Sequence, residues 1–184
     1  MKERRGKLLI IVDMQNDFIT GSLANKDAEA IVPGICDLIK NWKGDIFCTQ
    51  DTHYPNYLET QEGNNLPVEH CIYQTAGWCI HDDILKTLRT KNYNCILKSS
   101  FGSPELTEYR TIDNYEEVVL VGTCTDICVV SNALLVKSFF PEVKVTVISS
   151  LCAGVTKEKH EAALETMRSC QINVVSEVTI PDVK

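Results

Sequence analysis

The sequence predicts an α/β fold with a mostly parallel sheet of about six strands. Six short apolar runs recur along the chain, and segments with apolar residues at helical spacing separate several of them. Such alternation is typical of right-handed βαβ crossovers. The length of 184 residues and the hydrophobic content of 44% fit one domain over residues 1–184 with a sizeable core.

The N-terminal elements are indicated by their apolar patterns. Residues 8–12 are continuously apolar, as expected of a strand that is buried on both faces. A helix is predicted over 27–42, with Pro33 near its first turns, and a second strand over 45–49. Residues 51–79 show no sustained periodicity. A segment of that length without structure is usually functional or disordered.

The C-terminal part continues the alternation of helices and strands. The stretch 127–140 is apolar on nearly every side, which predicts a buried helix. The remaining predicted elements are a helix over 81–90, strands over 94–97, 118–122 and 143–148, a helix over 157–169 and a last strand over 172–175.

Composition excludes several classes of protein. Eighteen basic and 25 acidic residues give a net charge of −7, which disfavours binding to nucleic acid or to an anionic membrane. The apolar run after the basic N-terminus is too short for a signal peptide or a membrane span. Nine cysteines are an odd number, unlike a secreted disulfide scaffold. We therefore expect a cytoplasmic protein with reduced thiols.

Charged and thiol side chains follow four of the predicted strands. Asp13, Asp51 and Lys98 come directly after strands, and the stretch 122–128 follows another. Ligands of parallel sheets bind beyond the carboxyl ends of the strands. The sequence therefore predicts a site at this edge of the sheet.

Cys128 is the candidate nucleophile. It falls in the first turn of the predicted helix, where Thr125 or Asp126 is expected to cap and where free N–H groups favour a thiolate. Backbone N–H groups of the same turn are expected to hold an oxyanion. Cys124 is a rival nucleophile in the preceding turn, and a buried, unreactive Cys128 is the plain alternative.

Asp13 and Lys98 are the candidate partners of this thiol. A carboxylate at a strand end can accept the thiol proton and return it to a leaving amine. An ammonium near Asp13 and Cys128 is expected to hold both as anions. The alternatives are a turn-forming aspartate and a solvated lysine.

The long segment contains a candidate metal site. Asp51 and His53 are two residues apart at a strand end, and His70 follows in the same segment. Carboxylate and imidazole suit zinc, iron or manganese. Glu62 is our choice for a fourth ligand, with Glu59 or water as alternatives. Ordinary loop histidines would be the plain interpretation.

Five motifs, in this order, are Asp13-Met-Gln-Asn-Asp-Phe18, Asp51-Thr-His53, Pro67-Val-Glu-His70-Cys, Lys98 and Thr125-Asp-Ile-Cys128-Val, and together they cover most of the chain. The five together resemble the isochorismatase-like cysteine hydrolases. Within that family, Asp51-Thr-His53 with the later His70 resembles the nicotinamidase-like subgroup, whose members bind a metal.

The resemblance implies a Rossmann-like three-layer α/β/α fold and a catalytic triad of Asp13, Lys98 and Cys128. It implies a divalent metal, zinc first, on Asp51, His53 and His70, with Glu62 in the place of an acidic ligand in some members. It also implies a cis Thr123–Cys124 peptide and an oxyanion hole made by the N–H groups of Cys124 and Cys128. The implied activity is conversion of nicotinamide to nicotinic acid and ammonia through a thioester, in NAD salvage, by a dimer or tetramer.

Departures from the family pattern affect the substrate. Phe18 matches an aromatic residue that packs on the pyridine ring, but Leu66 and Pro67 replace the usual tryptophan before the second histidine. The ring is therefore expected to contact Phe18 and Phe101, together with Tyr57 or Leu66.

Other activities stay open on the sequence alone. The same fold could hydrolyse another small amide or an isochorismatase-type vinyl ether. Outside this class, an inactive binding or scaffold subunit is the main alternative. A redox protein is a weaker one, because Cys124 and Cys128 lack the C-x-x-C spacing.

Overall fold

Six parallel strands form one sheet in the computed structural model, which describes residues 5–177. The strand order is β3-β2-β1-β4-β5-β6, so the chain starts at the centre and crosses to each side in turn. All five strand pairs are parallel, in agreement with the predicted mostly parallel sheet. The strands are β1 (Arg5–Val12), β2 (Asp45–Asp51), β3 (Tyr93–Lys98), β4 (Tyr115–Thr123), β5 (Lys144–Ala153) and β6 (Asn173–Val175).

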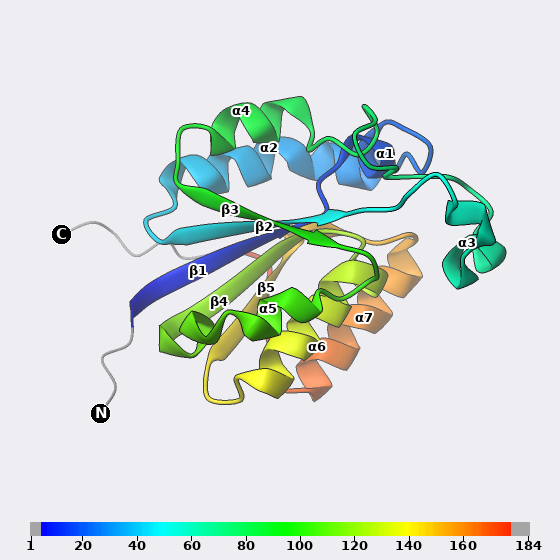
Figure 1. Ribbon diagram of the computed structural model, residues 1–184. Coiled ribbons are helices and arrows are strands. Elements are labelled where there is room, and N and C mark those ends of the chain that lie inside the picture. The colour runs from blue at the N-terminus through cyan, green and yellow to red at the C-terminus, as the bar shows by residue number, and fades with distance from the viewer. Residues whose placement is uncertain (1–4, 178–184) are drawn as a thin grey trace.

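Helices cover both faces of this sheet, which confirms the predicted three layers (Figure 1). On one face lie α1 (Asn16–Ile19), α2 (Lys26–Asn41) and α4 (Asp82–Leu88). On the other lie α5 (Pro104–Glu108), α6 (Val130–Phe139) and α7 (Lys157–Ser169). A short helix, α3 (Gln61–Asn65), stands away from both layers in the long segment after β2.

The central strand β1 shows why this sequence forms a buried sheet. Its side chains alternate between the two faces, since Leu8 and Ile10 join the apolar cluster that includes α6 and α7 residues. Leu9 and Ile11 join the cluster that includes α2 and α4 residues. All four side chains are buried, so a continuous apolar run is what a strand covered on both sides requires.

The predicted elements are all present, but their ends differ from the prediction, and short helices that were not predicted lie between them. Several strands are longer than predicted, and α1, α3 and α5 were not predicted because helices of four or five residues carry too little periodicity. Pro33 lies in the middle of α2 and not in its first turns. It is tolerated there because it is exposed, so the carbonyl that lacks a donor can face water. No helix within residues 5–177 is long and apolar enough to cross a membrane.

Candidate active site and metal centre

The carboxyl ends of the central strands bring the predicted site residues together. Asp13 follows β1, Asp51 ends β2 and Lys98 ends β3, while the turn after β4 carries Cys128. Asp51 and Lys98 are partners in the register of β2 and β3, and Val12 is the partner of Gly122 in that of β1 and β4. The sheet therefore places four distant segments next to one another at one edge.

Lys98 is the centre of this cluster. Its Nζ lies 2.7 Å from Oδ2 of Asp13, 3.1 Å from Oδ1 of Asp51 and 3.6 Å from Sγ of Cys128. It also donates a hydrogen bond to the Ser100 carbonyl at 3.0 Å. All four groups around this ammonium can accept its protons, so the buried charge has a complete set of partners.

The electrostatics of Lys98 and Asp13 follow from burial and from each other. Burial alone would lower the pKa of Lys98, but Asp13, Cys128 and Asp51 together raise it well above its ordinary value. The pKa of Asp13 is raised, chiefly by its burial and against the pull of Lys98, with Asp51 raising it further. Lys98 therefore stays charged, and Asp13 is a stronger base than an exposed aspartate.

Cys128 lies in a π-helical turn, Thr125–Val129, that leads into α6. Its thiol is buried, with 6% of the residue exposed. Burial and the nearby Asp13 carboxylate raise the pKa of Cys128 well above its ordinary value, although Lys98 lowers it. This direction runs against the expected preference for a thiolate, because burial and the Asp13 carboxylate outweigh the Lys98 ammonium.

The expected capping residues of this turn have other partners. Thr125 hydrogen-bonds the ring of His160 through its hydroxyl at 2.8 Å, and Asp126 accepts the Val155 N–H at 2.8 Å. No side chain caps the turn, so the predicted Thr125 or Asp126 cap is wrong. These two side chains connect the turn to the segment before α7 and to α7 itself. His160 of α7 is thus a hydrogen-bonding partner of this turn.

The peptide between Thr123 and Cys124 is cis, as the family resemblance implied. The carbonyl of Cys124 accepts hydrogen bonds from the N–H groups of Ile127 and Val129 at 3.1 Å and 3.0 Å. Burial raises the pKa of Cys124 to about 11. The pKa values of both thiols are therefore raised, and what distinguishes Cys128 is the Lys98 ammonium 3.6 Å from its Sγ.

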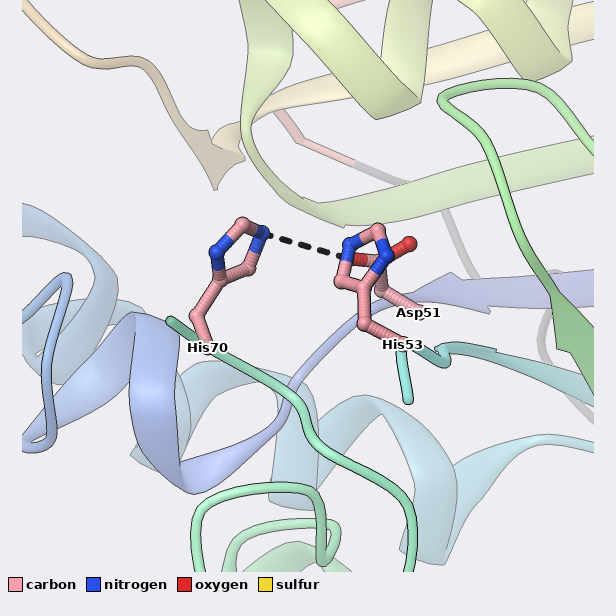
Figure 2. Close-up of side chains that lie close together, drawn as sticks. All are labelled: Asp51, His53 and His70. Atoms are coloured by element: carbon pink, nitrogen blue, oxygen red, sulfur yellow. Dashed lines mark ion pairs between the residues drawn. The ribbon is translucent and has the colours of Figure 1, made fainter. Parts of the chain in front are cut away.

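Asp51, His53 and His70 form the predicted metal cluster, and Figure 2 shows the three side chains pointing toward one another. One potential ligand atom from each lies within 4.8 Å of the others. Nε2 of His53 and of His70 lie 2.9 Å and 3.5 Å from Oδ2 of Asp51. Oε1 of Glu62 lies 3.7 Å and 3.8 Å from the same two nitrogens, so Glu62 stands at the open side of the cluster.

The donor set fits a divalent cation. Nδ1 of His70 lies 2.8 Å from the Val68 carbonyl, which can only accept, so Nδ1 carries the proton and Nε2 presents a lone pair to the cluster. Nε2 of His53 is buried 2.9 Å from Oδ2 of Asp51 and makes no hydrogen bond within the described residues. Two imidazole nitrogens and two carboxylates match zinc, iron or manganese.

The pKa values of the two acids differ within this cluster. Burial would raise the pKa of Asp51, but the two imidazoles and Lys98 hold it far below its usual range. Burial raises the pKa of Glu62, and the negative charge of Asp51 adds to this effect. Asp51 is therefore the ionised ligand in the absence of a cation. The pKa of His70 is raised by Asp51 in spite of its burial.

A pocket of about 820 Å³ opens beside these groups. His53 and Glu62 line it, whereas Asp13, Lys98 and Cys128 do not. Ser99 and Ile127, the chain neighbours of Lys98 and Cys128, are lining residues, so the buried cluster lies next to the residues that form the pocket wall. Three of the four predicted substrate contacts, namely Phe101, Leu66 and Tyr57, also line it. The ring of Tyr57 is fully buried against His53 and its hydroxyl is bonded to the Leu66 carbonyl.

Phe18 has a different position from the other predicted contacts. It is buried, with its ring 5.6 Å from that of His70, and it is not among the residues that line the pocket. Phe18 therefore packs against the imidazole of His70 in this structure.

Sequence reasoning missed two residues that hold the cluster. Thr49 donates a hydrogen bond to Oδ1 of Asp13 at 2.6 Å. The buried Gln15 side chain accepts the Asp51 N–H at 2.7 Å and donates to the Asp51 carbonyl at 2.9 Å. The place of Gln15 two residues after Asp13 is a usable signal, whereas Thr49 lies inside a predicted strand and offers none.

Residues 7–178 match the profile of the isochorismatase domain family. A nicotinamidase from Saccharomyces cerevisiae is 28% identical over 173 residues, which cover 70% of this chain and 80% of that protein. A nicotinamidase/pyrazinamidase from Mycobacterium tuberculosis is 29% identical over 192 residues, which cover 92% of this chain and 98% of that protein.

Solved structures with the same fold include enzymes of this kind. The nicotinamidase/pyrazinamidase of Acinetobacter baumanii has a TM-score of 0.78 and 26% identity, with 92% of this chain and 95% of that chain covered. The pyrazinamidase of Pyrococcus horikoshii in complex with zinc has a TM-score of 0.76 and 25% identity, with 93% and 99% covered.

Proposed function

Because the chain belongs to the isochorismatase domain family, we propose that it is a metal-assisted cysteine amidohydrolase that converts nicotinamide to nicotinic acid and ammonia. The observation that carries the proposal is the contact of one buried ammonium, Lys98, with both Asp13 and Cys128 beside a pocket. The similarity to nicotinamidases from two organisms supports the choice of substrate.

The first half-reaction forms a thioester. Asp13 takes the proton of the Cys128 thiol as the sulfur attacks the amide carbon, so the S–C bond forms and negative charge moves to the carbonyl oxygen. The backbone N–H groups of Cys124 and Cys128 stabilise that oxyanion. As the C–N bond breaks, Asp13 returns its proton to the nitrogen, and ammonia leaves.

The second half-reaction releases the acid. Asp13 takes a proton from a water molecule, whose oxygen adds to the thioester carbon. The S–C bond then breaks, and the proton on Asp13 returns to the Cys128 sulfur. Lys98 stays charged throughout. Its Nζ lies 2.7 Å from the Asp13 carboxylate and 3.6 Å from the Cys128 sulfur, so it keeps the two groups next to each other.

Asp51, His53 and His70 would hold the divalent cation, with Glu62 as the fourth ligand. When bound, the cation supplies a Lewis acid that orients a ring nitrogen or a water molecule. We propose zinc first, with iron or manganese as alternatives. The cytoplasmic location, the role in NAD salvage and the assembly into a dimer or tetramer stay predictions.

Another small amide is the second candidate substrate. Phe18, which was expected to pack on a pyridine ring, is outside the pocket lining, and the lining offers a ring Phe101, Tyr54 and Tyr57 instead. Ammonia release from a panel of amides, with nicotinamide first, distinguishes these substrates.

The test of the proposal is the nucleophile. Cys128→Ala should abolish ammonia release from nicotinamide, because no thioester can form. Cys170→Ala is the matched control, since this exposed thiol at the end of α7 is remote from the site. Substantial activity in the Cys128→Ala protein would remove the proposed mechanism. A wild-type protein that releases ammonia from no amide would favour the inactive binding subunit.

A further inference from the structure

Residues 99–103 connect β3 to α5 and form one wall of the pocket. Ser99, Ser100 and Phe101 line the pocket, and Phe101 is 46% exposed. The segment has no helix or strand of its own. Its position relative to the reacting sulfur must therefore come from contacts with the rest of the molecule.

Asn132 supplies two of these contacts from inside α6. Its side chain is fully buried and takes part in three hydrogen bonds. Oδ1 accepts the Ser103 N–H at 2.9 Å, and Nδ2 donates to the Phe101 carbonyl at 3.3 Å. Nδ2 also donates to the carbonyl of Cys128 at 2.8 Å. One amide thus connects the pocket wall to the residue that carries the nucleophile.

Two other contacts hold the wall against α6 and against Lys98. Gly102 packs so tightly on α6 that an added Cβ would lie 2.5 Å from Cδ1 of Leu135. The Ser100 carbonyl accepts a hydrogen bond from Lys98 at 3.0 Å. The wall is therefore held by the catalytic lysine at its start and by Asn132 at its end, with Phe101 between them.

We infer that Asn132 is a positioning residue that fixes the Phe101 wall relative to Cys128 and so sets the affinity for ring-bearing amides. The inference rests on the proposed function and extends it to substrate selection. Two of the three hydrogen bonds reach outside the helix, which a residue needed only for helix stability has no reason to form. Asn132 touches no reacting atom, and its effect on catalysis passes through Phe101.

Asn132→Thr should remove the hydrogen bonds of Asn132 to the wall while keeping its hydrogen bond to the Cys128 carbonyl. A threonine hydroxyl in a helix can donate to the carbonyl four residues earlier, so the bond to Cys128 can persist. The shorter side chain cannot reach Phe101 and Ser103 as well. We expect KM for nicotinamide to rise about tenfold while kcat stays within about twofold of wild type. Asn132→Ser, with the same donor on a smaller side chain, is the second variant if threonine is not accommodated.

A double-mutant cycle tests whether the effect passes through Phe101. Phe101→Ala alone should lower kcat/KM about tenfold. In the Asn132→Thr background the same change should lower it less than about twofold, because the Phe101 wall is already displaced there. Leu66→Ala is the matched control: it removes a lining residue that Asn132 does not contact, and its effect should be the same in both backgrounds. Equal losses for Phe101→Ala in both backgrounds would overturn the inference.

Hydrogen exchange gives a readout that does not depend on turnover. The Ser103 amide should exchange about tenfold faster in Asn132→Thr, because it loses its acceptor. Unchanged exchange together with unchanged KM would show that Asn132 does not hold the wall. If wild-type protein releases no ammonia from nicotinamide, the proposed function fails, and the Ser103 exchange still decides whether Asn132 holds this segment.

Discussion

Lys98 carries its charge at a place where an unpaired charge would be costly. Its side chain is 0% exposed, yet three anionic or polarisable groups surround the ammonium. Lys98 also neutralises part of the repulsion between Asp13 and Asp51. The same residue is therefore needed for the fold and for the proposed reaction, so its replacement should affect both.

Lys98→Met should destabilise the protein by about 3–5 kcal/mol, because it leaves two buried carboxylates without their cation. The control is Lys86→Met, since Lys86 pairs with Asp83 at 3.4 Å with both side chains at least 65% exposed. That change should cost less than about 1 kcal/mol. Urea unfolding of both variants measures the difference. Similar losses for the two lysines would contradict the assigned role of Lys98.

His53→Ala should remove the bound metal. It takes away one of three clustered donors, and loss of a ligand lowers affinity far more than loss of a nearby polar group. Elemental analysis of protein that was never exposed to chelator is the measurement, with about one ion per chain expected in wild type. His81→Ala, at the start of α4, is the control. Equal metal content in the two variants would refute the ligand set.

The clustered site residues could be predicted because they follow strands. Asp13, Asp51 and Lys98 lie at a common edge of any parallel sheet built from this chain. Thr49 and Asn132 could not be predicted, since each lies inside an apolar element and gains its role only through tertiary contacts. The raised pKa of Cys128 was not predictable either, because helix position favours a thiolate while burial, which the sequence does not give, opposes it.

At the scale of elements, a line of polar groups crosses four strands at the amino end of the sheet. Glu117 of β4 pairs with Lys7 of β1 at 2.7 Å and with Lys144 of β5 at 2.9 Å. Thr146 of β5 donates to Glu117 and accepts a hydrogen bond from Asn173 of β6. These contacts join β1, β4, β5 and β6 through side chains in addition to the backbone ladder.

The Glu117 network predicts a pH-dependent stability. Burial opposes ionisation, but Lys7, Thr146 and Lys144 hold the pKa of Glu117 at about 2, below its ordinary value of 4.5. A lowered folded-state pKa stabilises the fold above pH 4.5, and this contribution is lost as the pH falls toward 2. Because Lys144 is 57% exposed, we expect solvent to reduce the effect to about 1–2 kcal/mol.

Glu117→Gln tests this expectation. Wild type should exceed the variant in free energy of unfolding at about pH 7. The difference should shrink between about pH 4.5 and about pH 3, because the unfolded chain takes up a proton at Glu117 in this range while the folded protein keeps the carboxylate ionised. Urea unfolding at four pH values provides the measurement. Glu116→Gln, on the neighbouring exposed position, should show no such trend. A difference that grows on acidification would reverse the assigned sign.

Element boundaries were less predictable than the elements themselves. The turn that carries Cys128 is π-helical, and its side chains bond to His160 and Val155 from a segment about 30 residues away in sequence. A local capping rule assumes that such side chains turn back to their own helix. Here Thr125 and Asp126 bind partners elsewhere in the fold, so neither caps the turn, although the predicted helix is present.

At the scale of the whole molecule, the parallel sheet with helices on both faces follows from the alternation of strands and helices. Continuous apolar strands separated by helices indicated a parallel sheet covered on both faces, and the structure and the isochorismatase domain family agree with it. The order of the strands could not be fixed by apolar patterns, which are alike in all of them. One domain over residues 1–184 stays a prediction.

A fragment that ends at residue 112 should not fold. It contains β1, β2 and β3 but lacks β4, whose residues Val118–Val121 pair with Leu8–Ile11 of the central strand. One side of β1 would then expose its backbone groups. The apolar residues of α6 and α7 that cover this sheet would also be missing. Circular dichroism during urea titration should show no cooperative transition, in contrast to the full chain. A sharp transition in the fragment would contradict this view of the sheet.

The two ends of the sheet have separate tasks. Ion pairs around Glu117 lie at the ends where the strands begin, and the reactive groups lie where the strands finish. Substitutions that strengthen the first set need not disturb the second, because the full length of the apolar strands lies between them. Heat tolerance and turnover can therefore diverge independently among descendants of this chain, each by changes confined to its own rim.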